Sequence, residues 1–214
     1  MYGCRVFSVG IVIVAMLTGT SLADMVNGGF ETGDFTGWTT FVPPDASATV
    51  ETSHGEVGGQ PPPSWTPTEG IYFALLKTDG PGNLCTLSQS FGAQAGEVLG
   101  FDYFFDWGDY HDYDDQSYGR LYDSSGALVN EFFHWGAGGT LMGDNYSNVG
   151  WSPQSYTFTT GGTYTLEFGI ANQLDSDLAS YMGVDNVSVV PAPAAVLLGL
   201  LGMSVAGLKL RKFA

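Results

Sequence analysis

The residues best suited to chemistry crowd into one short acidic segment. Six aspartates fall within the 14 residues from Asp102 to Asp115, interleaved with aromatic side chains. Close carboxylates repel one another, and a divalent cation relieves that repulsion. The segment is therefore either a cation site or a solvated acidic loop. The four candidate ligands are Asp109, Asp112, Asp114 and Asp115.

The aromatic side chains of this segment suggest a second chemistry, the binding of sugars. The face of an aromatic ring packs on a pyranose ring, while nearby carboxylates accept hydrogen bonds from its hydroxyl groups. The candidate glycan contacts are Trp107, Tyr110 and Tyr113. The alternative is that most of these rings belong to the hydrophobic core.

Signals for catalysis are weak. His54, His111 and His134 show no zinc-site spacing, and the chain contains neither a GxSxG motif nor a phosphate-binding loop. A glycosidase needs two carboxylates at a set separation, and 22 acidic residues offer too many pairs to choose from. We expect a non-catalytic protein, with a polysaccharide lyase or glycosidase as the alternative.

The charges are distributed very unevenly along the chain. All 22 Asp and Glu residues lie between Asp24 and Asp185, where only Lys77 and Arg120 represent the six bases. Residues 24–193 therefore carry a net charge of −20 from 22 acids and two bases. Affinity for nucleic acid comes mostly from Lys and Arg, so we expect no nucleic-acid partner.

Residues 1–23 have the pattern of an export signal peptide. Arg5 is the only charge before an apolar run over residues 6–17, and Ser-Leu-Ala at 21–23 supplies a small-x-small cleavage site. We expect cleavage between Ala23 and Asp24. An uncleaved membrane anchor is the alternative.

The carboxyl end has its own pattern. Pro191, Ala192 and Pro193 precede an uncharged run over residues 194–208, and a basic tail closes the chain. As a helix this run would be ~22 Å long, short of a ~30 Å bilayer core, and snorkelling lysines could cover the difference. The run predicts a short transmembrane helix over 194–208 with its basic end in the cytoplasm.

This order of Pro-x-Pro, short apolar helix and basic terminus resembles the PEP-CTERM sorting signals that exosortases read. The resemblance covers residues 191–214, and Ala192 stands where the family usually has Glu. It implies an exported protein of a Gram-negative bacterium. The protein would be an inner-membrane intermediate, processed near the prolines, and then linked to the cell surface or the extracellular matrix.

Between the two ends, residues 24–190 read as short strands separated by turn signals. Phe101, Tyr103 and Phe105 alternate with Asp102 as in a half-buried strand, and a further strand is expected from Leu128 to Trp135. No amphipathic helix pattern is present. The sequence predicts an all-β, two-sheet jelly-roll β-sandwich, flanked by the signal peptide and the short transmembrane helix.

The last expected strand changes its apolar phase. Met182 and Val184 share one face, whereas Val187 and Val189 have the opposite parity. A β-bulge at residues 185–186 would explain the change, because it adds one residue and redirects the next side chain.

Two segments resemble galactose-binding-like jelly rolls. Residues 27–38 (NGGFETGDFTGW) resemble their opening, and residues 182–189 (MGVDNVSV) resemble their closing strand. The resemblance implies a structural calcium ion where the two meet, with Asp185 as a ligand and Glu31 opposite. Carbonyl oxygens of the turn 27–29 could complete its shell. The alternative is a surface aspartate in a bend.

These observations favour a non-catalytic, exported surface or matrix protein that associates with polysaccharide and is stabilised by calcium. The expected partners are an exopolysaccharide or other glycan, an exosortase-type sorting enzyme, and the membrane through residues 194–208. A purely structural matrix protein without a specific ligand is a further hypothesis.

Overall fold

A computed structural model describes residues 25–191 apart from 56, 58–63, 79, 111, 114, 141–142, 144 and 176. The expected signal peptide, its cleavage site at Ala23 and Asp24, and the segment 192–214 lie outside the described residues. Within the described part, no helix is long and apolar enough to cross a membrane.

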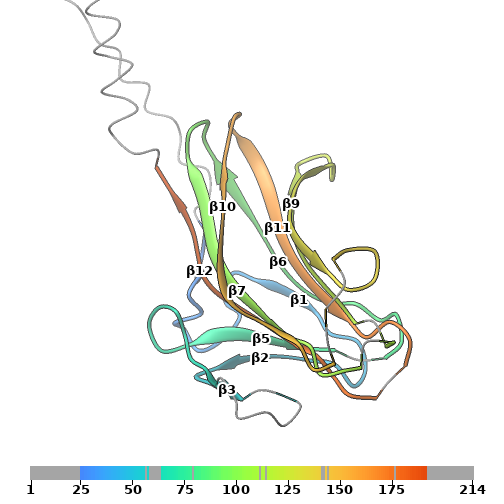
Figure 1. Cartoon of the computed structure of the whole chain (residues 1–214). Coiled ribbons are helices and arrows are strands. Elements are labelled where there is room, and N and C mark those ends of the chain that lie inside the picture. The colour runs from blue at the N-terminus through green and yellow to red at the C-terminus, as the bar shows by residue number, and fades with distance from the viewer. Residues whose placement is uncertain are drawn as a thin grey trace, which may run out of the picture.

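The described residues form an all-β sandwich of two five-stranded sheets (Figure 1), which confirms the predicted fold class. The first sheet has the order β1-β6-β11-β8-β9, and every neighbouring pair is antiparallel. Its strands are β1 (Thr39–Phe41), β6 (Cys85–Ala93), β11 (Gly162–Ala171), β8 (Gln116–Asp123) and β9 (Leu128–Trp135).

The second sheet has the order β10-β7-β12-β5-β2 and is also antiparallel. Its strands are β10 (Asn148–Thr157), β7 (Val98–Asp106), β12 (Tyr181–Val190), β5 (Phe73–Lys77) and β2 (Ser47–Glu51). A small hairpin of β3 (His54–Gly55) and β4 (Ser64–Trp65) forms a separate two-stranded sheet. The chain thus crosses between the sheets several times, which brings distant loops together at each end.

The core lies between the two sheets and follows from period-two alternation along the strands. In β7 the side chains of Leu99, Phe101, Tyr103 and Phe105 point inward and are buried. Phe168 of β11 faces them, and its ring meets Phe101 edge to face at 5.0 Å. Burial of this many aromatic rings supplies the main stabilisation of the sandwich.

The opposite face of the second sheet is also covered. Phe104 and Phe73 are buried there beneath Trp65 of the β3–β4 hairpin, whose ring stacks on Phe104 at 4.7 Å. The sequence did not indicate this second cluster. Trp65 comes directly after the proline-rich stretch, where a surface loop would be expected, and only its tertiary contacts bury it.

The bulge predicted in the last strand is confirmed. The register of β12 against β7 shifts between Asp185 and Ser188, and Asn186 adopts a positive φ of 54°. On the opening segment, the carbonyl of Gly28 accepts a hydrogen bond from the N–H of Val187 at 3.0 Å. The opening segment and the closing strand therefore meet at the bulge, as the resemblance implied.

Candidate functional site

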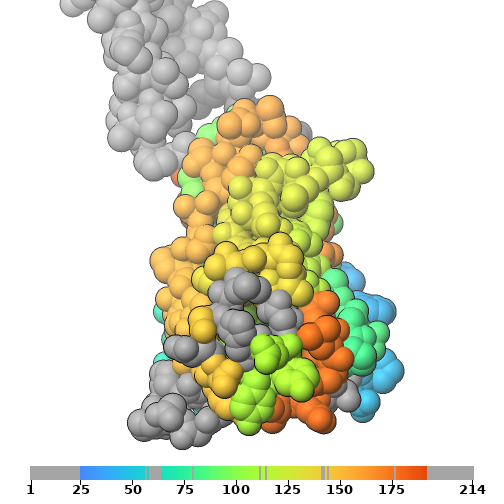
Figure 2. Space-filling view, turned by 45° about the vertical axis from the view of Figure 1, so that its right-hand side comes forward, coloured from blue at the N-terminus to red at the C-terminus, as the bar shows by residue number. Residues whose placement is uncertain are grey.

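A pocket forms at one end of the sandwich, where two long connections meet. The β7–β8 connection (107–115) and the β11–β12 connection (172–180) lie at the lower right in Figure 1. Figure 2 shows their lime-green and orange surfaces side by side on the lower part of the molecule. The cavity has a volume of about 190 Å³, and we call it the loop-end pocket. Its lining residues are Asp109, Tyr110, Tyr113, Asp175, Asp177 and Leu178.

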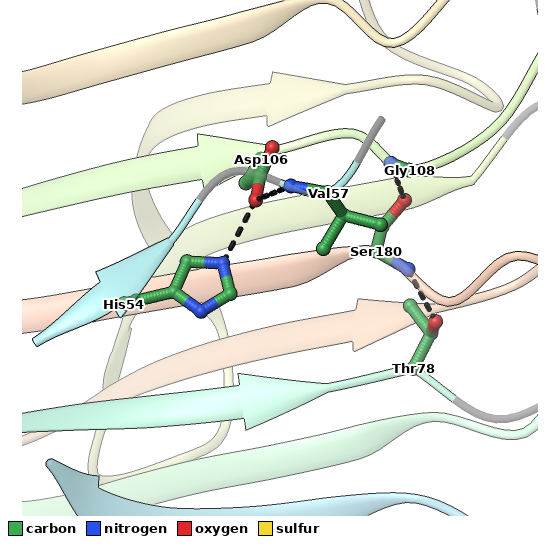
Figure 3. Close-up of polar contacts among 6 residues, drawn as sticks. All are labelled: His54, Val57, Thr78, Asp106, Gly108 and Ser180. Carbon is green, nitrogen blue, oxygen red and sulfur yellow. Dashed lines mark hydrogen bonds and ion pairs between the residues drawn. The ribbon is translucent and has the colours of Figure 1, made fainter. Parts of the chain in front are cut away.

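A hydrogen bond from a main-chain N–H to a serine hydroxyl joins the two connections. The N–H of Gly108 donates to Oγ of Ser180 at 2.8 Å, and the N–H of Ser180 donates to Oγ1 of Thr78 at 2.8 Å (Figure 3). A Cβ atom on Gly108 would lie 2.3 Å from the carbonyl oxygen of Ala179. Only glycine permits this approach, so residue 108 sets how closely the connections pack.

The end of β7 is anchored by a buried polar contact (Figure 3). Nε2 of His54 lies 2.8 Å from Oδ2 of Asp106, which also accepts the N–H of Val57 at 3.0 Å. The His54 ring stacks on Phe104 at 5.7 Å with an interplanar angle of 9°. These contacts fix the strand end two residues before Gly108.

A turn places two tyrosine rings at the pocket. The N–H of Tyr113 donates to the carbonyl of Tyr110 at 2.8 Å, and the two side chains are 43% and 45% exposed. The Tyr110 ring meets Tyr146 edge to face at 5.1 Å. Tyr146 therefore supports the Tyr110 ring, and both Tyr110 and Tyr113 remain open to solvent.

Asp109 is the most unusual residue of the pocket. Its side chain is 1% exposed, and Oδ1 accepts the N–H of Tyr110 at 2.6 Å. Oδ2 has no hydrogen-bond partner among the described residues. Burial raises the pKa of this carboxyl, the Tyr110 N–H opposes the rise, and the charges of Asp175 and Asp177 add to it. A buried acceptor without a donor is costly, so it points to a ligand that donates a hydrogen bond.

The second wall of the pocket is shaped by a buried asparagine. The amide of Asn172 donates to Oδ1 of Asp175 at 3.3 Å and to the carbonyl of Asp177 at 3.1 Å. Leu178 follows with a φ of 57°, a left-handed conformation that is costly for leucine. The wall is therefore built around a strained residue, as is frequent at binding sites.

Only some of the candidate cation and glycan ligands of the acidic segment lie in the loop-end pocket. Asp109, Tyr110 and Tyr113 come together in the pocket. Trp107 does not, because it is 1% exposed and packs in the core, so its prediction as a glycan contact is wrong. Asp112 is exposed and Asp115 is fully buried, and neither lines the pocket. Asp114 lies outside the described residues.

Sequence reasoning missed Asp175 and Asp177, which are two of the three acidic residues that line the pocket. Their signal was weak: Asn172, Asp175 and Asp177 form a polar run between two strands, which reads as an ordinary loop. Nothing in the sequence indicates that the run faces Tyr110, because about 60 residues separate them.

Asp185 and Glu31, the two residues expected at a calcium site, accept hydrogen bonds from the main chain of one loop segment. Oδ2 of Asp185 accepts the N–H groups of Thr68 at 2.7 Å and Glu69 at 3.1 Å, and Oδ1 accepts that of Asn186 at 2.7 Å. Oε1 of Glu31 accepts the N–H groups of residues 71 and 72 at 2.8 and 3.0 Å. Both carboxylates thus bind the main chain of residues 68–72.

The carboxylates of Asp185 and Glu31 supply only part of a calcium shell. Calcium needs six to eight oxygen ligands, whereas N–H donors occupy both oxygens of Asp185. Among the described residues, no three His, Cys, Asp or Glu side chains are grouped so as to hold a metal ion. Burial raises the pKa of Asp185, against the effect of its hydrogen bonds. Calcium at Glu31 and Asp185 stays a prediction.

A larger hollow of about 610 Å³, here called the sheet groove, lies over β6, β8 and β11. Several of its polar groups are already paired: Oγ of Ser90 lies 2.8 Å from Oγ1 of Thr165, and Glu167 accepts the hydroxyl of Tyr118 at 2.9 Å. Asp123 accepts the N–H of Ser125 at 2.8 Å. The smaller loop-end pocket is therefore the stronger candidate, because it contains an unpaired buried acceptor.

No family model matches this chain, and no curated protein matches it by sequence. Several solved structures show weak similarity. The carbohydrate-binding module TmCBM61, in complex with beta-1,4-galactotriose, is 14% identical with a TM-score of 0.47, over 78% of this chain and 97% of that one. The K1 cleaved adhesin domain of Lys-gingipain from Porphyromonas gingivalis W83 is 12% identical with a TM-score of 0.43, over 82% and 100%.

The enzymatically active domain of tailspike protein 4 from bacteriophage CBA120 is 10% identical with a TM-score of 0.45. The alignment covers 77% of this chain but only 21% of the tailspike chain. Similarity at this level does not identify a ligand or an activity, so the functional argument rests on the pocket itself.

Proposed function

We propose that this chain is a non-catalytic glycan-binding domain whose loop-end pocket holds a terminal sugar. The observation that carries the proposal is the buried, unpaired Oδ2 of Asp109 beside two exposed tyrosine rings. A sugar supplies both partners that this arrangement lacks: hydroxyl donors for the carboxylate and apolar C–H faces for the rings.

The size of the pocket supports binding of one unit rather than a chain. Its volume of about 190 Å³ is below the ~300–1,000 Å³ of ordinary small-molecule sites. A single ring at the end of a polysaccharide or at a branch suits such a volume. The polysaccharide would then extend away from the sandwich.

The test is a binding assay with a panel of oligosaccharides, using wild type, Tyr110→Ala and Tyr122→Ala. We expect Tyr110→Ala to weaken binding about tenfold, since loss of one aromatic contact costs ~0.5–1.5 kcal/mol beyond its buried area. Tyr122 lines the sheet groove, so its replacement should leave binding unchanged. Loss of binding in Tyr122→Ala alone would move the site to the groove.

One observation favours a second candidate function. A carboxyl whose pKa is raised by burial, as at Asp109, resembles the general acid of a glycosidase in its protonation, and two further carboxylates line the same pocket. This hypothesis predicts release of reducing sugar from a polysaccharide panel and loss of that release in Asp109→Asn. Binding without product release supports the non-catalytic proposal.

We further propose export through residues 1–23 and sorting through residues 191–214. The strong charge asymmetry supports this topology, because Arg5 and the basic residues 209, 211 and 212 flank the acidic segment. The partners would be an exosortase-type enzyme at Pro191, Ala192 and Pro193, the membrane, and an extracellular glycan.

Calcium binding at Glu31 and Asp185 is a separate proposal with its own test. A ligand at a hundredfold excess over its Kd stabilises the folded state by ~2.7 kcal/mol, which should raise the Tm by roughly 5–10 °C. Thermal melts in EDTA, calcium and magnesium at equal ionic strength measure this shift, and magnesium should do less. Identical melts in all three would overturn the proposal of calcium at these two carboxylates.

A further inference from the structure

We propose that the sugar bound in the loop-end pocket carries a free, positively charged amino group. The inference rests on the proposed glycan-binding function and specifies the substrate class of that same site.

The first argument is the imbalance of charge within the pocket. Asp109, Asp175 and Asp177 line it, and none of its other described lining residues is a lysine or an arginine. Arg120, one of only two such bases in the described residues, is held by Glu131 at 2.7 Å on the β8–β9 pair. A neutral sugar would leave the three carboxylates to repel one another, whereas an ammonium group offsets that repulsion.

The second argument is the state of Asp109. Its Oδ2 is buried and unpaired among the described residues, while Oδ1 is used by the N–H of Tyr110. A charged donor strengthens such a hydrogen bond about twofold over a neutral hydroxyl. An ammonium group therefore satisfies this oxygen better than a sugar hydroxyl does.

The third argument concerns the walls. Tyr110 and Tyr113 are nearly half exposed, and the face of a tyrosine attracts a cation by ~0.5–1 kcal/mol at an exposed site. Residues 24–193 also carry a net charge of −20, from 22 acidic and two basic residues. That field repels uronates and sulfated sugars and attracts cationic ones.

The experiment compares two ligands that differ only in the acetyl group, the trimers of glucosamine and of N-acetylglucosamine. Binding to the purified full chain is measured by calorimetry at about pH 6, where most sugar amines are protonated. We expect the glucosamine trimer to bind at least tenfold more tightly, and added NaCl to weaken it selectively.

Variants locate the interaction. If Asp109→Asn fails to fold because Asp109 is buried, Asp177→Asn still tests the pocket, because Asp177 is exposed. Each should reduce affinity for the glucosamine trimer about tenfold, the value of one hydrogen bond to a charged group. Glu51→Gln removes one charge at the far end of β2 and should have no effect, since Glu51 pairs with Phe73 rather than with the pocket end of β5.

The outcomes separate the two proposals. Equal or tighter binding of the N-acetylated trimer would overturn the amino-sugar inference and leave the glycan-binding function standing. No binding of any oligosaccharide would overturn both. Spermidine binding as tightly as the glucosamine trimer would show a general amine site and would also overturn the inference. An effect of Glu51→Gln equal to that of Asp177→Asn would assign the preference to net charge instead of the pocket.

Discussion

At Asp185 a single carboxylate joins the closing strand to a loop more than a hundred residues earlier. The residue is fully buried, and its two oxygens accept three main-chain N–H groups. An ionised carboxylate suits three N–H donors, because both of its oxygens accept hydrogen bonds and neither carries a hydrogen. The residue acts here through hydrogen bonding, whatever its affinity for metal.

Replacing Asp185 by asparagine should therefore destabilise the fold. The new amide places an NH2 group against a main-chain N–H, and one unsatisfied buried donor costs ~1–3 kcal/mol. Urea unfolding measures the change. Asp102→Asn is the matched control on the paired strand, because Oδ2 of Asp102 accepts only the Thr68 hydroxyl and the Asn186 amide, which can both reorient. Equal stability of Asp185→Asn and wild type would contradict this role.

Asp109 should give stability an unusual pH dependence. Its pKa lies above the ordinary value of an aspartate, chiefly because of burial. The folded state therefore holds this proton more tightly than the unfolded chain does. The stability that Asp109 contributes is fully present below the unfolded pKa and is lost as pH rises through the folded pKa.

The measurement is urea unfolding of wild type and Asp109→Asn between about pH 3.5 and about pH 7. The variant lacks this titration, so its stability relative to wild type should improve as pH rises. Asp123→Asn should shift the opposite way, because hydrogen bonds from Ser125 and Ala127 lower the pKa of Asp123. A parallel pH profile for wild type and Asp109→Asn would argue against a raised pKa.

At the scale of elements, the pocket depends on how the β7–β8 and β11–β12 connections approach each other. The two follow strands that lie in different sheets, and Gly108 and Ser180 join them. The rigid sheets set the distance, and the connections supply the chemistry.

Gly108→Ala should separate these connections. Its Cβ would clash with the Ala179 carbonyl at 2.3 Å, and overpacking of this kind costs ~1–3 kcal/mol. We expect reduced stability and loss of sugar binding together, measured by thermal melting and calorimetry. Gly150→Ala is the control, since a Cβ there meets nothing within 4 Å. Unchanged binding in Gly108→Ala would show that the pocket does not need this packing.

At the scale of the whole molecule, the acidic sandwich and its two ends have opposite charge. The described residues contain Lys77 and Arg120 as their only Lys or Arg. A strongly negative domain stays soluble and avoids phosphate-bearing partners. The basic ends suit the inner surface of a membrane.

Deletion of residues 191–214 should therefore move the protein from the cell envelope to the medium. Fractionation followed by immunodetection measures the distribution, and mass spectrometry of the mature protein should find an amino terminus at Asp24. A variant with Lys209, Arg211 and Lys212 all replaced by glutamine separates the role of the basic charges from that of the apolar run. An unchanged distribution after deletion would remove the sorting proposal.

The sequence alone determined the all-β fold class and the bulge at residues 185–186, and it singled out Asp109, Tyr110 and Tyr113, which the structure brings together in one pocket. All of these follow from local patterns: alternation of period two, a change of apolar phase, and aromatic residues beside acids within a few positions. Its position beside several aspartates also placed Trp107 with the glycan contacts, although Trp107 shares the parity of the buried Phe101, Tyr103 and Phe105, and the structure buries it with them.

Only the tertiary structure decided which acids meet. Asp175 and Asp177 join Asp109 in the pocket, while Asp112 and Asp115, much closer in sequence, do not line it. The contact between connections 107–115 and 172–180 is made by strands that pair across long stretches of chain, as Tyr181 of β12 pairs with Asp106 of β7. Such pairing depends on how two whole sheets bury their apolar faces, which no local spacing of residues records.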